Sequence, residues 1–120
     1  MKKIWVAVML MVSVSCANAL PSAEFRLCVQ RAGSKDVQRS VCYQQEMAVQ
    51  DARLNRAYQA VMKGSSSVDK VALRQHQRSW IRQRDNECKE ELGGETVINS
   101  RCVMEKTDQR ADELESKLSY

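Results

Sequence analysis

The residues that could carry out chemistry in this chain are few, and they lack the partners that a catalytic site needs. The single histidine, His76, has no second ligand at metal-binding spacing, and the serines have no histidine base. Glu46 and Asp51 could resemble the paired carboxylates of a glycosidase. We expect Asp51, however, to face an arginine that favours its ionised form, so it is a poor proton donor. The sequence predicts neither an enzyme nor a metal or cofactor site.

The N-terminus and the cysteines predict an exported domain. Residues 1–3 are cationic, residues 4–14 are apolar, and the small residues at 17–19 are typical of a cleavage site, so 1–19 is predicted to be a signal peptide and 20–120 one domain. Lipidation at Cys16 is disfavoured because Ser13 stands where a large aliphatic residue is needed. Loss of Cys16 leaves an even number of cysteines, which predicts two disulfides in an oxidising compartment such as the periplasm. These cysteines are Cys28, Cys42, Cys88 and Cys102.

Caps and glycine breaks predict four helices in the exported chain, over about 22–31, 36–63, 66–92 and 96–120. No segment shows sustained strand alternation. The two long helices are joined by Gly64 and three serines and should fold back as an antiparallel hairpin. The predicted fold is therefore all-α, a small antiparallel helical bundle stapled by two disulfides.

Polar residues interrupt the apolar stripes of both long helices. Asp51 lies on the inner stripe of the first long helix and Arg84 on that of the second, which also carries Trp80 as a core residue. The hairpin register brings these stripes together and predicts an Asp51–Arg84 ion pair. An arginine fork can satisfy a buried carboxylate, so we interpret the cluster as structural. The expected network comprises Asp51, Asn55, Gln77, Arg84 and Thr107.

Charge is unevenly distributed, although cleavage would lower the net charge only from +4 to +2 by removing two lysines. Residues 20–84 carry 12 Lys and Arg against 5 Asp and Glu, whereas residues 85–120 carry 5 against 10. The small total argues against a nucleic-acid partner. Two candidate partner-binding surfaces follow, each of which simple solvation would also explain. One is a basic ridge of Arg74, Arg78 and Arg82, and the other is an acidic loop with Glu87, Glu90, Glu91 and Glu95.

Several spaced motifs resemble one family. They are Cys42-x-x-x-Glu46, Asp51-x-x-Leu54-Asn55-x-x-Tyr58, Leu73-x-x-x-Gln77-Arg78-x-Trp80-x-x-x-Arg84-Asp85-x-x-Cys88 and Cys102-x-x-x-x-Thr107-x-x-Arg110-x-x-x-Leu114. Together they resemble the lysozyme inhibitor LprI-like proteins, which are small exported bacterial domains. His76 and Gln83 depart from the usual pattern, where a small residue and an aromatic residue are common.

The resemblance also bears on the disulfides. The residues alone leave three connectivities open, and the hairpin register allows Cys42 to meet Cys88. The resemblance implies that each pair is close in sequence, giving Cys28–Cys42 and Cys88–Cys102.

The function implied by the resemblance is inhibition of lysozyme-type peptidoglycan hydrolases by a periplasmic binding protein that occludes the active-site cleft. Two alternatives remain open at this point. One is an immunity protein that neutralises a wall-degrading toxin, and the other is a structural or stress protein of the envelope that uses the basic ridge. The expected partner in the first two cases is a protein, with a peripheral envelope contact in the third.

Overall fold

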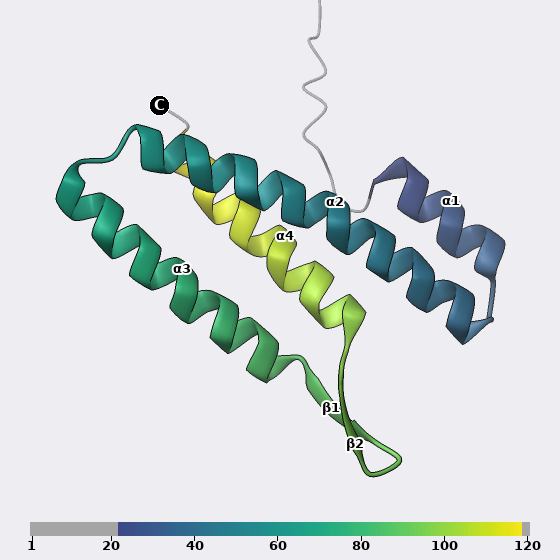
Figure 1. Cartoon of the computed structure of the whole chain (residues 1–120). Helices are drawn as coiled ribbons and strands as arrows, with labels where there is room; N and C mark the ends of the chain where they lie inside the picture. The colour runs from purple at the N-terminus through teal and green to yellow at the C-terminus, as the bar shows by residue number, and fades with distance from the viewer. Residues whose placement is uncertain (1–21, 119–120) are drawn as a thin grey trace, which may run out of the picture.

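The computed structural model describes residues 22–118, which form four helices and one small β-hairpin (Figure 1). Helix α1 spans Ala23–Ala32, α2 spans Asp36–Lys63, α3 spans Ser67–Glu87 and α4 spans Ser100–Ser116. Strands β1, Lys89–Leu92, and β2, Glu95–Ile98, lie between α3 and α4. The all-α bundle with two long helices is thus confirmed. The prediction of uninterrupted helix to residue 92 was wrong, because α3 ends at Glu87 and the next residues pair as strands.

Serine caps begin two of the helices. Ser22 Oγ accepts a hydrogen bond from Phe25 N at 3.2 Å, and Ser66 Oγ accepts one from Asp69 N at 3.1 Å. Each cap satisfies a backbone N–H that the first turn of a helix leaves unpaired. The predicted start of the third helix at Ser66 is therefore confirmed.

Helix α4, and not α3, is the main packing partner of α2. Figure 1 shows α4 between α2 and α3, running in the same direction as α2, while α3 runs the opposite way. The predicted α2–α3 hairpin turns back as expected, but its two helices do not form the packed pair. The physical reason is the number of inward side chains, since α3 buries only Leu73 and Gln77 whereas α4 buries five. The five are Val103, Met104, Thr107, Ala111 and Leu114.

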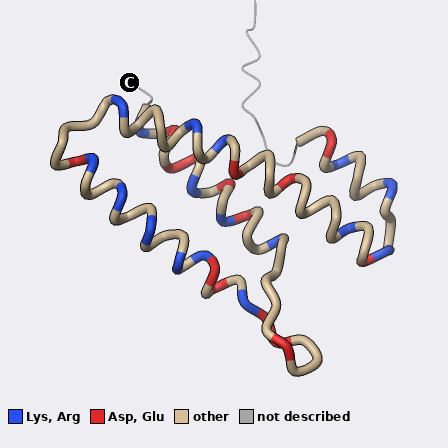
Figure 2. Tube along the Cα trace, viewed as in Figure 1, with Lys and Arg blue, Asp and Glu red and all other residues tan. Residues whose placement is uncertain are grey.

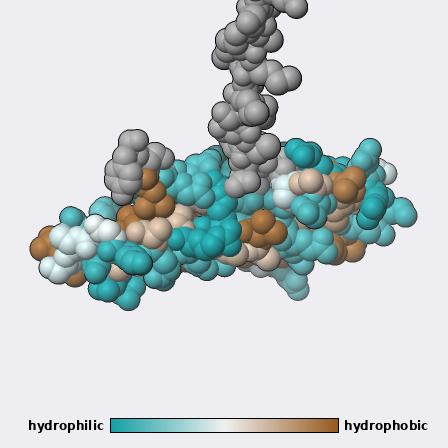
Figure 3. Space-filling view, turned by 90° about the horizontal axis from the view of Figure 1, so that it is seen from above, coloured by the Kyte–Doolittle hydropathy of each residue, from teal (hydrophilic) through white to brown (hydrophobic). Residues whose placement is uncertain are grey.

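The hydrophobic core lies between α2 and α4, towards the C-terminal end of both helices. Its buried members are Leu54, Ala57, Leu73, Ala111 and Leu114. Only Leu73 comes from α3, so this helix reaches the core at its N-terminal half. On the face shown in Figure 3, the hydrophobic residues form small separate groups.

Two disulfides join neighbouring elements in the predicted pairing. Cys28–Cys42 links α1 to α2 with its Cα atoms 5.7 Å apart, and Cys88–Cys102 links the end of α3 to α4 with its Cα atoms 5.5 Å apart. Each bond closes a loop of the same length, with a sequence separation of 14. The predicted signal peptide and Cys16 lie outside the described residues. Among residues 22–118, no helix has the length and apolar character needed to cross a bilayer.

Candidate functional site

The β-hairpin projects beyond the helices at the end of α3 (Figure 1). Its register pairs Lys89 with Ile98 and Leu92 with Glu95, so Gly93 and Gly94 form a two-residue turn. Both glycines have positive φ, +60° and +85°, which a tight turn of this kind requires and which other residues rarely adopt. A side chain at either position would meet no neighbour within 4 Å, so conformation and not crowding explains the glycines.

The base of the hairpin is fixed to two helices. Cys88, which is 1% exposed, is bonded to Cys102 in the first turn of α4. Asn99 N donates to the Cys88 carbonyl at 2.9 Å, and Asn99 Oδ1 accepts from Cys102 N at 2.9 Å. Asn99 is thereby the cap of α4 and also the last link of the hairpin. The strands consequently leave the helical body from a covalently fixed point.

The predicted acidic residues are all exposed, and the strand register divides those of the hairpin between its two faces. Alternation along the strands places Glu90 and Glu95 on one face, together with Leu92. Glu90 accepts a hydrogen bond from Asn99 Nδ2 on this face. Glu91 lies on the other face, where it accepts a hydrogen bond from Thr96 Oγ1 at 2.6 Å. One face thus presents two carboxylates around an exposed leucine.

Glu87, the fourth predicted acidic residue, belongs to α3 and faces α4. Lys106 Nζ lies 2.6 Å from its carboxylate, and Gln83 Nε2 donates to it at 2.8 Å. The hydrogen bond from Lys106 lowers the pKa of Glu87 below its ordinary value. Glu87 therefore helps to hold the end of α3 against α4, and we place it at the margin of the acidic surface.

The predicted basic ridge lies along α3, where cationic positions recur at nearly every turn (Figure 2). Arg74, Arg78 and Arg82 are exposed. Arg82 Nη2 donates to Ser79 Oγ at 3.3 Å. The charged residues of the hairpin beyond the end of the same helix are three glutamates and one lysine, so surfaces of opposite sign lie next to each other (Figure 2).

The predicted Asp51–Arg84 ion pair is wrong. Asp51 is exposed, and so is Asn55 one turn along. Arg84 instead pairs with the adjacent Asp85, at 2.9 Å, and its Nη1 donates to Thr107 Oγ1 at 3.3 Å. The error follows from the packing, because α4 occupies the position that the predicted hairpin assigned to α2. The approach of Arg84 to Thr107 agrees with the expectation for that pair.

The other inward residues of α3 meet α4 through the same kind of contact. Gln77 Oε1 accepts from Arg110 Nε at 3.0 Å. Trp80, expected in the core, is partly buried against it and lies 5.0 Å from the Arg84 guanidinium and 5.9 Å from that of Arg110. Cation–π attraction of this kind contributes about 0.5–2 kcal/mol depending on exposure. Polar and aromatic contacts, more than apolar burial, therefore hold α3 to α4.

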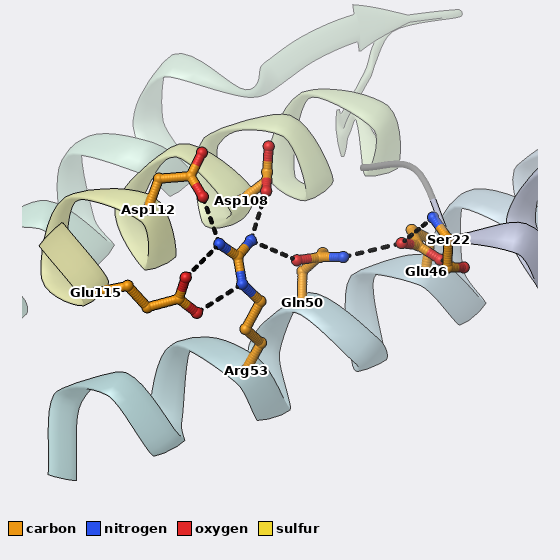
Figure 4. A network of polar contacts seen from close by, with 7 residues as sticks. All are labelled: Ser22, Glu46, Gln50, Arg53, Asp108, Asp112 and Glu115. Carbon is orange, nitrogen blue, oxygen red and sulfur yellow. Dashed lines mark hydrogen bonds and ion pairs between the residues drawn. The ribbon is translucent and has the colours of Figure 1, made fainter. Parts of the chain in front are cut away.

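The main polar network lies between α2 and α4 and is centred on Arg53 (Figure 4). Its guanidinium contacts three carboxylates of α4, with 2.7 Å to Asp108 and 2.7 Å to Glu115, and also contacts Asp112. Arg53 Nη1 donates in addition to Gln50 Oε1 at 3.2 Å. The side chain of Arg53 is 11% exposed, whereas its partners range from 21% exposed for Asp108 to 64% for Asp112, so the guanidinium is shielded from water while the acidic side of the cluster remains partly solvated.

The network continues along α2 to the start of α1. Gln50 Nε2 donates to Glu46 at 2.9 Å, and Glu46 accepts from the backbone N–H of Ser22 at 3.1 Å and from its hydroxyl. Glu46 and Gln50 are each 2% exposed. The carboxylate of Glu46 is satisfied by these donors, which is what permits its burial. Glu46 thus links α2 to the start of α1, while Asp51, the other carboxylate considered from the sequence, is exposed.

The charges gathered around Arg53 shift the pKa values of Arg53 and Asp108. The hydrogen bond from Arg53 to Glu115, reinforced by Asp112 and Asp108, raises the pKa of Arg53. Burial raises the pKa of Asp108, and Asp112 and Glu115 add to this effect, while Arg53 opposes it. Arg53 therefore stays charged, whereas Asp108 is more readily protonated than an ordinary aspartate.

Sequence reasoning missed Arg53, although a signal for it existed. Asp108, Asp112 and Glu115 recur at intervals of four and three residues and so lie on one face of α4. Three acids in such a row predict a cationic partner on the facing helix. Helix α3 was expected to be the packing partner of α2, so the acidic row of α4 was not matched with an arginine of α2.

An open groove of about 600 Å³ lies between α3 and the ends of α2 and α4. Its lining includes His76, Trp80 and Arg110.

Within residues 22–118, no three His, Cys, Asp or Glu side chains come together in a way that could hold a metal ion.

The part of the chain that resembles known proteins includes both disulfides and the hairpin. The sequence pattern of one family, described as lysozyme inhibitor LprI, matches residues 28–114. The chain belongs to the LprI family of lysozyme inhibitors. The matched region begins at the first disulfide cysteine and ends at the core residue Leu114, so it contains both disulfides and the acidic hairpin.

One relative of this LprI-family chain is an uncharacterized protein of Rhizobium meliloti (strain 1021). It is 32% identical over 94 residues, which cover 62% of this chain and 68% of the relative. No solved structure matches the chain. Membership of the LprI family implies a protein partner such as a lysozyme, and the two disulfides fit a location outside the cytoplasm.

Proposed function

We propose that this protein inhibits a lysozyme-type peptidoglycan hydrolase by covering its substrate cleft with the β-hairpin, after export into the periplasm or beyond the cell. The observation that carries the proposal is an exposed acidic hairpin fixed by a disulfide at its base. Family membership supplies the class of partner. Inhibition of this kind needs complementary surfaces and no bond-making step.

Charge supports the approach of the two proteins. Many lysozymes are strongly cationic around an acidic cleft, so a hairpin with Glu90, Glu91 and Glu95 would attract the enzyme before contact. Attraction between opposite surface charges raises the association rate and weakens as salt is added. The carboxylates of Glu90 and Glu91 are already held by hydrogen bonds within the hairpin, which limits their freedom before binding.

Rigidity supports the persistence of the complex. A loop that is ordered only on binding loses conformational entropy at that moment, and this loss weakens affinity. The hairpin avoids much of that cost, because Cys88–Cys102 and the Asn99 hydrogen bonds fix its base before any partner arrives. Leu92, 60% exposed next to the turn, supplies apolar surface that can be buried in the cleft.

The proposal is tested by measuring inhibition of several lysozymes by the oxidised protein. We expect Glu90→Gln with Glu95→Gln to raise the inhibition constant by about tenfold at low salt, and by less at high salt, because steering and contact are both weakened. A matched control, Glu24→Gln with Asp51→Asn, removes the same charge from exposed positions on α1 and α2. Potency of the wild type should fall with added salt, while that of the hairpin variant should change less.

Two results would overturn the proposal. One is full activity of every lysozyme in the presence of correctly oxidised protein. The other is an equal loss of potency in the hairpin variant and in the control, which would mean that net charge and not the hairpin matters.

A further inference from the structure

We propose that the outward face of α3 binds the surface of an anionic phospholipid bilayer. This interaction is separate from inhibition of a hydrolase and uses a different face of the protein. It is carried by the basic ridge, defined above as Arg74, Arg78 and Arg82, together with exposed apolar residues beside it.

The outward face of α3 is free of the rest of the fold. Leu73, Gln77 and Arg84 point the opposite way, into the core or towards Arg110 and Thr107 of α4. At 3.6 residues per turn, Arg74, Arg78 and Arg82 lie about 80°, 120° and 160° from the middle of that inner face. Helix α3 therefore presents its ridge to the surroundings along about 12 Å of its length.

Apolar side chains accompany the ridge. Val71 precedes Arg74 by three residues and Ile81 follows Arg78 by three, so each lies next to a ridge arginine on the helix surface. Val71 is 51% exposed and Ile81 is 39% exposed. Cationic and apolar side chains on one exposed helix face suit the boundary between lipid headgroups and acyl chains.

Acidic neighbours do not cancel the charge of the ridge. Asp85, which follows the ridge on the same face, is paired with Arg84 at 2.9 Å. Asp69 lies on the groove side of α3, where its carboxylate accepts a hydrogen bond from Ser66 Oγ at 2.7 Å. The ridge thus keeps a local excess of positive charge, although the whole exported chain is almost neutral.

Charge complementarity selects the partner. A cationic enzyme would be repelled by the ridge, whereas anionic phospholipid headgroups would be attracted to it. A soluble anionic polymer would also meet the arginines, but it would gain nothing from Val71 and Ile81. The apolar side chains therefore favour a bilayer over a polymer.

The test is sedimentation with vesicles of phosphatidylglycerol and phosphatidylcholine, and with vesicles of phosphatidylcholine alone. We expect binding to the anionic vesicles only, with release at high salt. Arg74→Gln, Arg78→Gln and Arg82→Gln together should lower the partition coefficient by about 100-fold, because each basic side chain near an anionic surface contributes about fivefold. The matched control replaces the exposed arginines Arg26, Arg31 and Arg56 by glutamine and should lower it much less.

A second variant separates a bilayer from a polymer. Val71→Ser with Ile81→Ser keeps every charge and should lower binding to the vesicles by about fivefold, because less apolar surface is buried. Binding to dextran sulfate should be unchanged by the same substitutions. Since all these side chains are exposed, circular dichroism and the melting temperature should match those of the wild type in each variant.

Three outcomes would overturn the proposal. The first is a wild-type protein that fails to sediment with anionic vesicles. The second is an equal loss of binding in the ridge variant and in the control, which would indicate a response to net charge. The third is vesicle binding that is unaffected by the serine substitutions, which would point to recognition of any anionic polymer.

Discussion

The α2–α4 pair and the α3–hairpin arm differ in how they are held together. The pair shares a buried apolar core and the Arg53 network, whose central guanidinium is shielded from water. The arm buries two side chains of α3 and is fixed to α4 by a disulfide and a few polar contacts. Both candidate binding surfaces lie on the arm. We therefore expect the pair to supply most of the stability through its buried core, while the arm leaves its outer residues exposed to partners.

The largest expected effect is the loss of stability when a buried leucine is truncated, measured at one leucine in each region. Leu114→Ala in α4 should lower the free energy of unfolding by about 4 kcal/mol, because Leu114 is 0% exposed and its loss leaves a closed cavity. Leu73→Ala in α3 should cost about 2 kcal/mol, since the groove beside Leu73 is open and water can enter the space that the side chain leaves. Chemical denaturation of the oxidised variants measures both. Equal losses would show that the arm is as firmly packed as the pair.

The two disulfides give a second test, because they close loops of equal length. Replacing either pair of cysteines by alanine should lower the free energy of unfolding by about 3 kcal/mol. Only the Cys88 and Cys102 replacement should also weaken inhibition of lysozyme, since it alone releases the hairpin base. Denaturation and inhibition assays on the two variants check this difference. Inhibition lost equally in both would mean that the hairpin base has no special role.

A third test compares arginines. Arg53→Met should cost about 2 kcal/mol of stability, because it removes the cation that Asp108 and Asp112 contact, although partial exposure of these two acids limits the loss. Arg84→Met should cost about 1 kcal/mol through its contacts with Thr107 and Trp80. Arg82→Met, on the exposed ridge, should change little. Thermal and chemical denaturation would reveal the order, and a larger loss for Arg84 than for Arg53 would reverse the comparison.

The smallest expected effect concerns pH. The pKa of Asp108 is raised above the ordinary value of 3.8, chiefly by burial, so the folded state favours its protonated form. This contribution to stability is fully present below the unfolded pKa and is lost as pH rises through the folded pKa. Relative to Asp108→Asn, the wild type should therefore be most stable at low pH and should lose that advantage as Asp108 ionises. Denaturation of both proteins across this range measures the change. If the wild type instead gained stability over Asp108→Asn as pH rose, Arg53 would lower the pKa of Asp108 by more than burial raises it.

Much of the fold could be predicted from the sequence because its signals are local. Ser66 with Asp69 marks the start of a helix. The cysteine pairing, in contrast, came from the family resemblance, because the residues alone left three connectivities open. The choice of packing partner is not local. Whether Arg84 meets Asp51 or Thr107 depends on which helix packs against α2. That single choice explains both the wrong ion pair and the missed Arg53 network.

The hairpin was missed for a different reason. Residues 89–92 and 95–98 are only four residues each, and most of them are polar and exposed. The usual sign of a strand, alternation of buried and exposed residues, is therefore absent. The pair of glycines was interpreted as a helix end, and only their positive φ values identify the tight turn. The acidic and basic surfaces were located by residue type alone, because exposed charges need no knowledge of packing.

The order of the cysteines along the chain has a consequence for maturation. In a chain that enters an oxidising compartment from its N-terminus, Cys28 and Cys42 meet an oxidant before Cys88 and Cys102. Among the four cysteines of residues 22–118, each native bond also joins nearest neighbours in sequence, across a separation of 14, and short loops close with the least entropy loss. Consecutive oxidation during emergence would thus yield the native bonds directly, and the protein should mature without help from a disulfide isomerase.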